Sequence, residues 1–350
     1  MTQDAHRAKV GYFCSYVPKE IIYAFDRVPV RVLPTAAKAS AAEAFLPRNF
    51  CSLVKTTLAS FLENESDLEA VVHADSCDAL RRLHDVWRHY VDIDALHLLD
   101  LPRTNTPTGQ EYFCHALRQL AEKLEQRCHL RLTAQRLGTA IECYNEQRSL
   151  LQELDAAWIE GRIASVEYYR HCSAAMTEDP LLVNAQLRER LDEIVRQEPP
   201  AHHNSSILVV GSLLVRPDLV EAIEDHGARV VADDSCSIGR VVTGQIPVSK
   251  DLDGILTNIA VAYLGKPPCP RMRDFPRRLE HLSQLIASHG VQGVICSYYK
   301  FCDLFMSEYP VLRKAMQDRG IPVLLLEDEG EAILSGQHRT RLEAFLELLQ

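Results

Sequence analysis

The sequence lacks any apolar run that approaches the roughly 20 residues needed to cross a bilayer. Its first ten residues, MTQDAHRAKV, also lack the apolar core of a secretory signal. Positive charge is not in excess, because 38 Lys and Arg stand against 48 Asp and Glu and give a net charge of -10. No basic field is therefore available to attract a phosphate backbone. These absences predict a cytoplasmic protein that binds neither nucleic acid nor membrane.

Phosphate-binding loops are missing as well. G-x-G-x-x-G follows neither of the strands that open the two halves, and G-x-x-x-x-G-K-[ST] occurs nowhere in the chain. Nucleotide hydrolysis is therefore expected on a different protein. Cysteine, in contrast, is abundant: the 350 residues include 11, an odd number with no C-x-x-C pair, unlike the framework of a small secreted disulfide fold. Core packing, metal binding and catalysis all stay open for these thiols.

Two regions of β/α alternation flank a helical region. Residues 108–197 show a 3.6-residue apolar period, and the turn-rich stretch 198–206 has the composition of a linker. The apolar runs on either side are short and typical of strands in parallel sheets; they are residues 10–14, 30–33, 70–74, 96–99, 207–210, 229–232, 293–296 and 323–326. The pattern predicts an α/β fold with two Rossmann-like parallel-sheet domains, residues 1–107 and 201–350, and a helical segment with linker over residues 108–200.

The two halves resemble each other. Residues 21–32 (IIYAFDRVPVRV) align without gaps on residues 219–230 (LVEAIEDHGARV), and each segment follows a strand and a proline. This match suggests an internal duplication, although helix periodicity accounts for part of it.

Several cysteines lie just beyond predicted strands, where open α/β sheets collect their ligands. Cys77, Cys236 and Cys302 follow strands, and Cys51 lies in a loop-like segment. Four such thiols, far apart in sequence, could converge between two domains and bind an iron–sulfur cluster, since such clusters need thiolates and not adjacent ones. Spacing alone leaves core packing open. Ser15, after the first strand, offers a hydroxyl to a substrate pocket or caps the local backbone.

Six ordered blocks resemble the 2-hydroxyacyl-CoA dehydratase and benzoyl-CoA reductase subunit family, which includes the 2-hydroxyglutaryl-CoA dehydratase D-component. The first block here is GYFCSYVPKEIIYAFDRVPVRV, similar to the family's GYFCTYVPEELIYAAG-x-PVR. The chain departs from that pattern at residues 25–27, where the family has small residues and Gly. The later blocks are LPRNFCSLVKTT, DSCDALRRL, ADDSCSIGR, PPCPRMRDFPRRLEHL and YYKFCDLF.

The resemblance implies a [4Fe–4S] cluster held by Cys51, Cys77 and Cys302, with one iron left open to water, sulfide or a substrate oxygen. A double-cubane [8Fe–9S] relative would add Cys236 and Cys269 as ligands. The resemblance also implies a coenzyme A site, for which Arg271 and Arg273 of the basic segment 271–278 are candidates, unless that segment is a solvated helix face. Ser15 is the candidate catalytic residue.

The activity implied is that of one subunit of an ATP-activated dehydratase that acts on a 2-hydroxyacyl-CoA through a ketyl radical. Its partners would be a homologous second subunit or a second copy of the chain, a separate iron–sulfur ATPase activator, and the acyl-CoA substrate. Three alternatives stay open: a benzoyl-CoA reductase-type subunit, a double-cubane reductase of small molecules, and a non-catalytic partner subunit or two-domain scaffold whose cysteines only pack.

Overall fold

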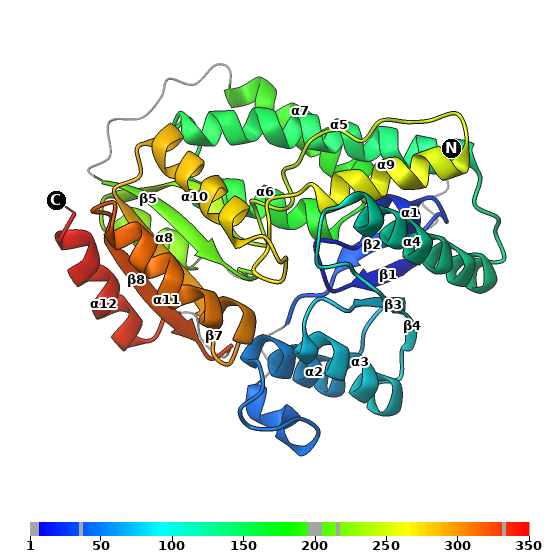
Figure 1. Ribbon diagram of the computed structural model, residues 1–350, viewed down its shortest axis with the longest axis horizontal. Helices are drawn as coiled ribbons and strands as arrows, with labels where there is room; N and C mark the ends of the chain where they lie inside the picture. Colours follow the sequence, from blue (N-terminus) through cyan, green and yellow to red (C-terminus); the bar gives the residue numbers. More distant parts are fainter. Residues whose placement is uncertain (1–6, 35–37, 195–204, 215–217, 331–333, 350) are drawn as a thin grey trace.

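Two separate parallel sheets organise the molecule (Figure 1). The computed structural model describes residues 7–34, 38–194, 205–214, 218–330 and 334–349. The N-terminal sheet has the order β2-β1-β3-β4 and the C-terminal sheet the order β6-β5-β7-β8. The strands are β1 (Lys9–Tyr12), β2 (Val28–Arg31), β3 (Leu68–Ala74), β4 (Asp94–Leu99), β5 (Ser205–Gly211), β6 (Ala228–Asp234), β7 (Gly293–Tyr299) and β8 (Val323–Asp328). Each overlaps a predicted strand, and the predicted α/β fold with two parallel sheets is confirmed.

The strand order is the same in both sheets when each half is counted from its own first strand. Both halves place their first strand between the second and the third, with parallel pairing throughout. A duplicated ancestral unit would produce this arrangement.

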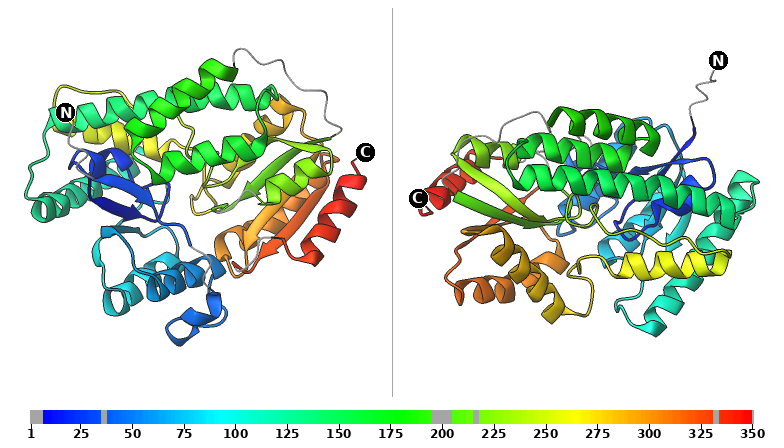
Figure 2. Two further views of the ribbon diagram at one scale, coloured as in Figure 1. Left: turned by 180° about the vertical axis from the view of Figure 1, so that it is seen from behind. Right: turned by 90° about the horizontal axis from the view of Figure 1, so that it is seen from above.

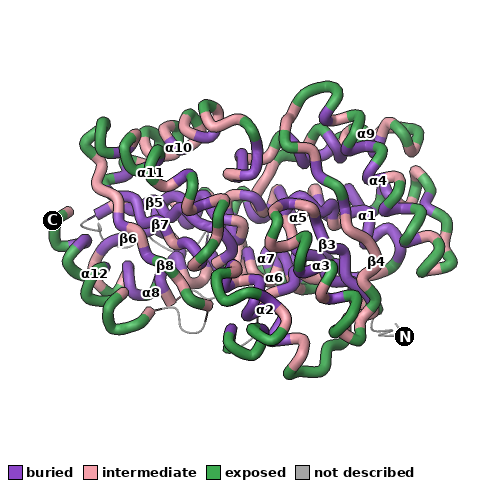
Figure 3. The backbone as a smooth tube through the Cα atoms, turned by 60° about the horizontal axis from the view of Figure 1, so that its bottom comes forward, coloured by how far each residue is buried: buried purple, intermediate pink, exposed green. Residues whose placement is uncertain are grey.

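Helices cover both faces of each sheet. Apolar residues alternate between the faces: in β5, Ile207 and Val209 belong to one core and Leu208 and Val210 to another. Figure 3 shows most of the strands buried, with β4 more exposed and with exposed stretches on outer helices such as α10. The helices are α1 (Lys19–Tyr23), η1 (Ala39–Ala44, a 3₁₀ helix), α2 (Ser52–Glu63), α3 (Asp78–Tyr90), α4 (Pro107–Cys128), α5 (Ala134–Ile159), α6 (Ser165–Thr177), α7 (Pro180–Ile194), α8 (Asp218–Asp225), α9 (Leu252–Leu264), α10 (Phe275–His289), α11 (Asp303–Gln317) and α12 (Gly336–Glu347).

The two halves interlock through α5 and α9. The first part of α5, with Ile141 and Tyr144, packs into the core of the N-terminal sheet, whereas Leu151 and Leu154 pack into the core of the C-terminal sheet. Helix α9 follows β6 of the C-terminal sheet but packs against α4 and α5, over the N-terminal sheet. Figures 1 and 2 show α5 spanning both halves. Interdomain movement would therefore disturb both cores.

The boundaries between the three predicted segments, after residues 107 and 200, stay a prediction. The second boundary falls within residues 195–204, outside the described residues. The last helix of the helical segment begins at Pro180, and the Asp179 carboxylate before it accepts from the Leu181 main-chain N–H at 2.9 Å. Over the described ranges, no helix is both long and apolar enough to cross a membrane.

Candidate functional site

Three of the predicted cluster cysteines occupy equivalent positions, each immediately before a helix. Cys51 is the N-cap residue of α2, Cys77 that of α3 and Cys302 that of α11. The first two come from the N-terminal half and the third from the C-terminal half. The N-terminus of a helix carries partial positive charge and exposed N–H groups, which stabilise an anionic thiolate. The fold therefore directs helix N-termini from both halves to these thiols.

Cys51 and Cys302 meet across the seam between the halves, where their thiols are hydrogen-bonded to each other. The main-chain N–H of Ser52 donates to the Lys300 carbonyl at 3.0 Å, which docks the start of α2 onto the turn after β7. In that turn Phe301 adopts a left-handed conformation with φ 61°. An aromatic residue rarely adopts this conformation, so the surrounding contacts must hold the turn that presents Cys302.

Cys77 lies close enough to Cys302 to interact with it electrostatically. Its sulfur accepts from the Leu80 main-chain N–H at 3.4 Å. Burial raises the pKa of Cys77 to about 12, and the pKa of Cys302 is raised by its hydrogen bond to Cys51 and by burial. As free thiols these groups stay protonated at neutral pH, and a bound metal reverses this because a coordinating thiol is deprotonated.

The three thiols suit an iron–sulfur cluster by donor type, since thiolate is the ligand that such clusters require. No three His, Cys, Asp or Glu side chains within the described residues are arranged to hold a single metal ion. The ligands of a cubane bind different iron atoms, so they need not meet at one point.

A second group of thiols, Cys14, Cys236 and Cys269, lies beside the first. Cys236 follows β6, and its main-chain N–H donates to the Ser212 carbonyl at 2.9 Å. Burial raises the pKa of Cys269 to about 12, and Cys236 and Cys14 both contribute to that rise. Cys14 also interacts electrostatically with Cys77. Cys14, Cys236 and Cys269 thus interact electrostatically with one another, and Cys14 and Cys269 also interact with Cys77.

A buried ion network lies beneath Cys236 and Cys269. The Asp234 carboxylate accepts from Arg240 at 3.1 Å and from Arg278 at 2.6 Å, and Arg278 also donates to Glu308 at 2.6 Å. Asp234, Arg240 and Arg278 are at most 1% exposed. Burial alone would raise the pKa of Asp234, but the two guanidinium groups hold it well below its usual range. The carboxylate is therefore ionised at neutral pH.

This network fixes the segments that carry two of the seam cysteines. Asp234 and Arg240 stand on either side of Cys236 in sequence, and their ion pair closes the loop between them. Arg240 and Arg278 both donate to the carbonyl of Pro268, the residue before Cys269, at 3.0 and 2.8 Å. Asp234 is thus placed to position both cysteines.

Ser15 lies at the same seam. Its hydroxyl donates to the Cys236 carbonyl at 3.2 Å, and Arg31 donates to that hydroxyl at 3.5 Å. The hydroxyl thus contacts the opposite half of the chain instead of capping its own helix. Its catalytic role stays a prediction.

The two arginines considered for coenzyme A differ in exposure. Arg271 is 4% exposed, and its guanidinium donates to four main-chain carbonyls, those of Ser76, Pro102, Asp75 and Leu101. These bonds anchor the segment after Cys269 to the N-terminal half. Arg273 is exposed. A contact with coenzyme A phosphates stays a prediction for both residues.

Sequence reasoning missed a cluster of charged side chains at the junction of α1, α5 and α9. The Glu20 carboxylate, 0% exposed, accepts from Arg148 at 2.6 Å and from the Tyr263 hydroxyl at 2.7 Å. The ammonium group of Lys266 donates to the Ser15 carbonyl at 2.8 Å, and that of Lys19 donates to the Ala175 carbonyl at 3.0 Å. The only signal in the sequence is a Lys-Glu pair that leads directly into the apolar run of α1.

Burial lowers the pKa of Lys266 to about 7 and that of Lys19 to about 8. The unfolded chain, with lysine pKa values near 10.4, then binds more protons than the native chain above pH 7. Stability should rise with pH from about 7 towards 10, because the cost of burying a charged Lys266 disappears as the group loses its proton.

Replacing Lys266 by Met should accordingly stabilise the protein by roughly 2 kcal/mol at pH 6.5, and the gain should vanish towards pH 10. Urea unfolding at several pH values measures the effect. The exposed Lys123 on α4 supplies the matched control, since Lys123→Met should change stability by no more than about 0.5 kcal/mol. A pH-independent loss of stability in Lys266→Met would contradict the predicted burial of charge.

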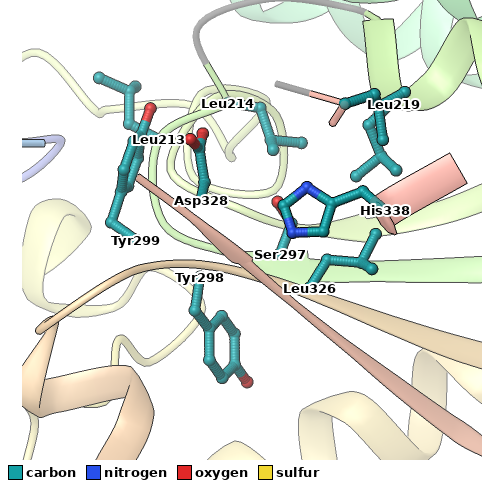
Figure 4. Close-up of a pocket in the computed structure, with 10 residues that line it drawn as sticks. Leu213, Leu214, Leu219, Ser297, Tyr298, Tyr299, Leu326, Asp328 and His338 are labelled. Atoms are coloured by element: carbon teal, nitrogen blue, oxygen red, sulfur yellow. The ribbon is translucent and has the colours of Figure 1, made fainter. Parts of the chain in front are cut away.

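A small cavity at the carboxyl end of the C-terminal sheet adjoins the turn that carries Cys302 (Figure 4). Tyr299 and Tyr298 point to opposite faces of β7, so that Tyr299 lines the side on which α2 docks. The carbonyl of Asp328, at the end of β8, accepts from the Ser52 hydroxyl at 2.9 Å. The strand ends therefore help to hold α2, and with it Cys51, against the C-terminal half.

Comparison with known proteins agrees with the family resemblance of the six sequence blocks. The family described as "2-hydroxyglutaryl-CoA dehydratase, D-component" matches residues 14–349. The chain is 24% identical to the (R)-phenyllactyl-CoA dehydratase beta subunit of Clostridium sporogenes, over 100% of this chain and 93% of that protein. It is 23% identical to a benzoyl-CoA reductase subunit of Thauera aromatica (92% and 85%) and 24% identical to the beta subunit of (R)-2-hydroxyglutaryl-CoA dehydratase of Acidaminococcus fermentans (97% and 92%).

Proposed function

This chain belongs to the 2-hydroxyglutaryl-CoA dehydratase D-component family, and we propose that it is one subunit of an iron–sulfur enzyme that dehydrates a 2-hydroxyacyl-CoA. The observation that carries the proposal is the placement of Cys51, Cys77 and Cys302 at three helix N-termini around the seam. The relatives named above act on CoA thioesters as dehydratase or reductase subunits.

In this proposal Cys51, Cys77 and Cys302 hold a [4Fe–4S] cluster, which when bound supplies a low-potential electron at the interdomain seam. The protein's own contribution is to hold and shield the ligands. The three helix N-termini favour the thiolate form, and the docking of Ser52 against the turn after β7 keeps Cys51 beside Cys302. The network around Asp234 fixes the neighbouring cysteine segments.

Dehydration by this route overcomes a problem of acidity. The β-hydrogen of a 2-hydroxyacyl-CoA is hardly acidic, because the thioester acidifies the α-position and not the β-position. A base therefore cannot readily remove this hydrogen in an ordinary acid–base elimination. One added electron converts the thioester into a ketyl radical anion, which expels the 2-hydroxyl group and then loses its now acidic β-proton. The electron is returned at the end, and the net products are an enoyl-CoA and water.

The second group of thiols supports a second candidate. Cys236 and Cys269 lie beside the first trio and interact electrostatically with each other and with Cys14. A double-cubane [8Fe–9S] cluster would use such additional thiols, and the chain would then reduce small molecules. A reductase of aromatic CoA thioesters is the corresponding alternative for a single cluster, given the similarity to a benzoyl-CoA reductase subunit.

The partners follow from the same proposal. All three relatives are named as single subunits of their enzymes, so a homologous second subunit, or a second copy of this chain, is expected to complete the enzyme. The resemblance to the family implies that a separate iron–sulfur ATPase supplies the electron, and the absence of both phosphate-binding loop motifs from the sequence agrees with this. The proposed location is the cytoplasm.

An anaerobic reconstitution tests the function. The purified chain should not turn over a 2-hydroxyacyl-CoA by itself, and turnover should require a homologous partner subunit, an activator, ATP and a reductant together. Omission of each component in turn is the control, and enoyl-CoA formation is the readout. Turnover by the chain alone without ATP contradicts the proposed division of labour.

A further inference from the structure

A cavity of about 180 Å³ lies beside β6, the edge strand of the C-terminal sheet. Helices α5 and α6 pack on one face of this sheet and α10 on the other, and the cavity lies between them at the edge (Figure 2). A cavity of about 150 Å³ accommodates benzene, so this one has room for a six-membered ring and a small substituent. Its lining is accessible, because Asp155, Leu285 and His289 are only half-buried.

The carboxylate of Asp155, on α5, has no positive partner in this lining. Its Oδ1 accepts from the Tyr168 hydroxyl at 2.5 Å. Its Oδ2 has no hydrogen-bond partner within the described ranges, and this oxygen keeps accessible surface. Burial raises the pKa of Asp155, because removal from water penalises the charged form. A cation that reached Oδ2 would therefore meet a negative charge that the surrounding side chains leave unpaired.

Two histidines of α10 also line the cavity. His289, at the end of the helix, interacts electrostatically with Asp155, but the two side chains form no ion pair in the described structure. His281 is directed instead to the buried network, with its Nε2 3.4 Å from the Asp234 carboxylate. A neutral imidazole offers one acceptor nitrogen, and an ammonium group offers three donors. One ammonium group is therefore able to donate to Asp155 and His289 together.

The remaining wall suits the apolar body of such a ligand. The rings of Trp158 and Tyr168 are stacked, with centroids 4.5 Å apart, and aromatic ring faces attract cations. Asp233, the second carboxylate in the lining, already accepts from the Tyr169 hydroxyl and the Ser235 main-chain N–H. Among the described residues that line the cavity none is Lys or Arg, so an anion would find no such counterion there.

We propose that this cavity binds one small organic amine in its ammonium form. The ammonium group would lie between Asp155 and His289, and the apolar body would pack against Trp158 and Tyr168. A neutral molecule of the same shape leaves the Asp155 carboxylate without a counterion, and buried charges are costly unless they are paired. A metal ion fits less well, because no three His, Cys, Asp or Glu side chains over the described ranges are arranged to hold one.

The inference goes beyond the proposed function and does not rest on it, because none of the cysteines in the described ranges lines the cavity. The lining nevertheless includes segments that carry two of them. Gly239 belongs to the loop that follows Cys236, and Pro267 precedes Cys269 by two residues. A bound amine would therefore contact both segments.

Calorimetric titration of the full chain with benzylamine at neutral pH tests the proposal. Benzylamine carries an ammonium group there and has a body of one ring, so one molecule is expected to bind per chain. Asp155→Asn should weaken this binding by about tenfold or more, because the variant removes the counterion but keeps an oxygen for the Tyr168 hydroxyl. Glu153→Gln, which alters an exposed carboxylate on the same helix, should leave the affinity unchanged.

A second measurement needs no variant and is therefore unaffected by any folding defect. Benzyl alcohol has the same shape without the charge, and it should bind to the wild-type chain about tenfold more weakly than benzylamine, or weaker still. Absence of saturable binding of both benzylamine and butylamine to the wild-type chain would overturn the proposal. So would equal affinity of benzylamine and benzyl alcohol, or equal affinity of Asp155→Asn and the wild type for benzylamine.

Discussion

Replacing Cys302 by Ser is expected to lower the iron content of the anaerobically purified chain to less than about a tenth of the wild-type value. Only three thiolates are proposed to hold the [4Fe–4S] cluster, and the replacement leaves two of them. Of the three predicted [4Fe–4S] ligands, Cys302 is the one supplied by the C-terminal half, and it is hydrogen-bonded to Cys51. Its loss removes the ligand that closes the site across the seam. Iron and acid-labile sulfide analysis, with the charge-transfer absorption of the cluster, measures the effect.

Cys128 provides the matched control. It ends α4, is half-buried and lies in the apolar core of the N-terminal half, so Cys128→Ser should leave the iron content unchanged. Equal iron content in Cys302→Ser and the wild type, with both proteins folded, would remove Cys302 from the ligand set. Parallel variants of Cys236 and Cys269 separate the cluster types: the [4Fe–4S] proposal expects little loss of iron from either, and the double-cubane proposal expects a large loss from both.

Replacing Asp234 by Asn is expected to lower the free energy of unfolding by about 3–5 kcal/mol, because it leaves the buried guanidinium groups of Arg240 and Arg278 without their shared counterion. The folded carboxylate has a lowered pKa, so its stabilisation is complete above the unfolded value near 3.9 and is lost as the pH falls through the folded value. The difference between wild type and variant should therefore be large at pH 7 and shrink in strong acid.

Urea unfolding of Asp234→Asn beside Asp253→Asn measures this difference. Asp253 pairs with Arg118 on the surface, with the two side chains 75% and 41% exposed, so its replacement should cost no more than about 1 kcal/mol. Because the Asp234 network holds the residues around Cys236 and Cys269, the variant should also show increased reactivity of these thiols towards a maleimide. Similar losses in the two variants would show that the buried network contributes no more than a surface ion pair.

The fold was largely predictable because most of its strands are buried on both faces, and all of them contain short apolar runs. All eight runs correspond to strands. The crossing of α9 to the N-terminal sheet was not predicted, since the sequence of residues 252–264 does not identify the sheet that a helix formed by them covers. The packing of α5 into both cores was not predicted for the same reason.

The candidate site was predictable only where residues follow strands. That rule selected Cys77, Cys236 and Cys302. Cys51 was selected with them from a loop-like segment, and the family resemblance added Cys269. The cluster of charged side chains at the junction of α1, α5 and α9 was missed because Arg148 and Lys266 lie on or after helices far from Glu20 in sequence. Only the packing of α5 and α9 on α1 brings these residues together. Arg271 shows the converse, because a basic residue that suggested a phosphate contact donates to four carbonyls of the backbone.

Iron and acid-labile sulfide in the anaerobically purified wild-type chain provide the most direct test of the central claim, that the seam between the two sheets holds an iron–sulfur cluster. The account predicts about four iron and about four sulfide per chain, the content of one [4Fe–4S] cluster. Folded protein that contains neither iron nor sulfide after anaerobic reconstitution would contradict it.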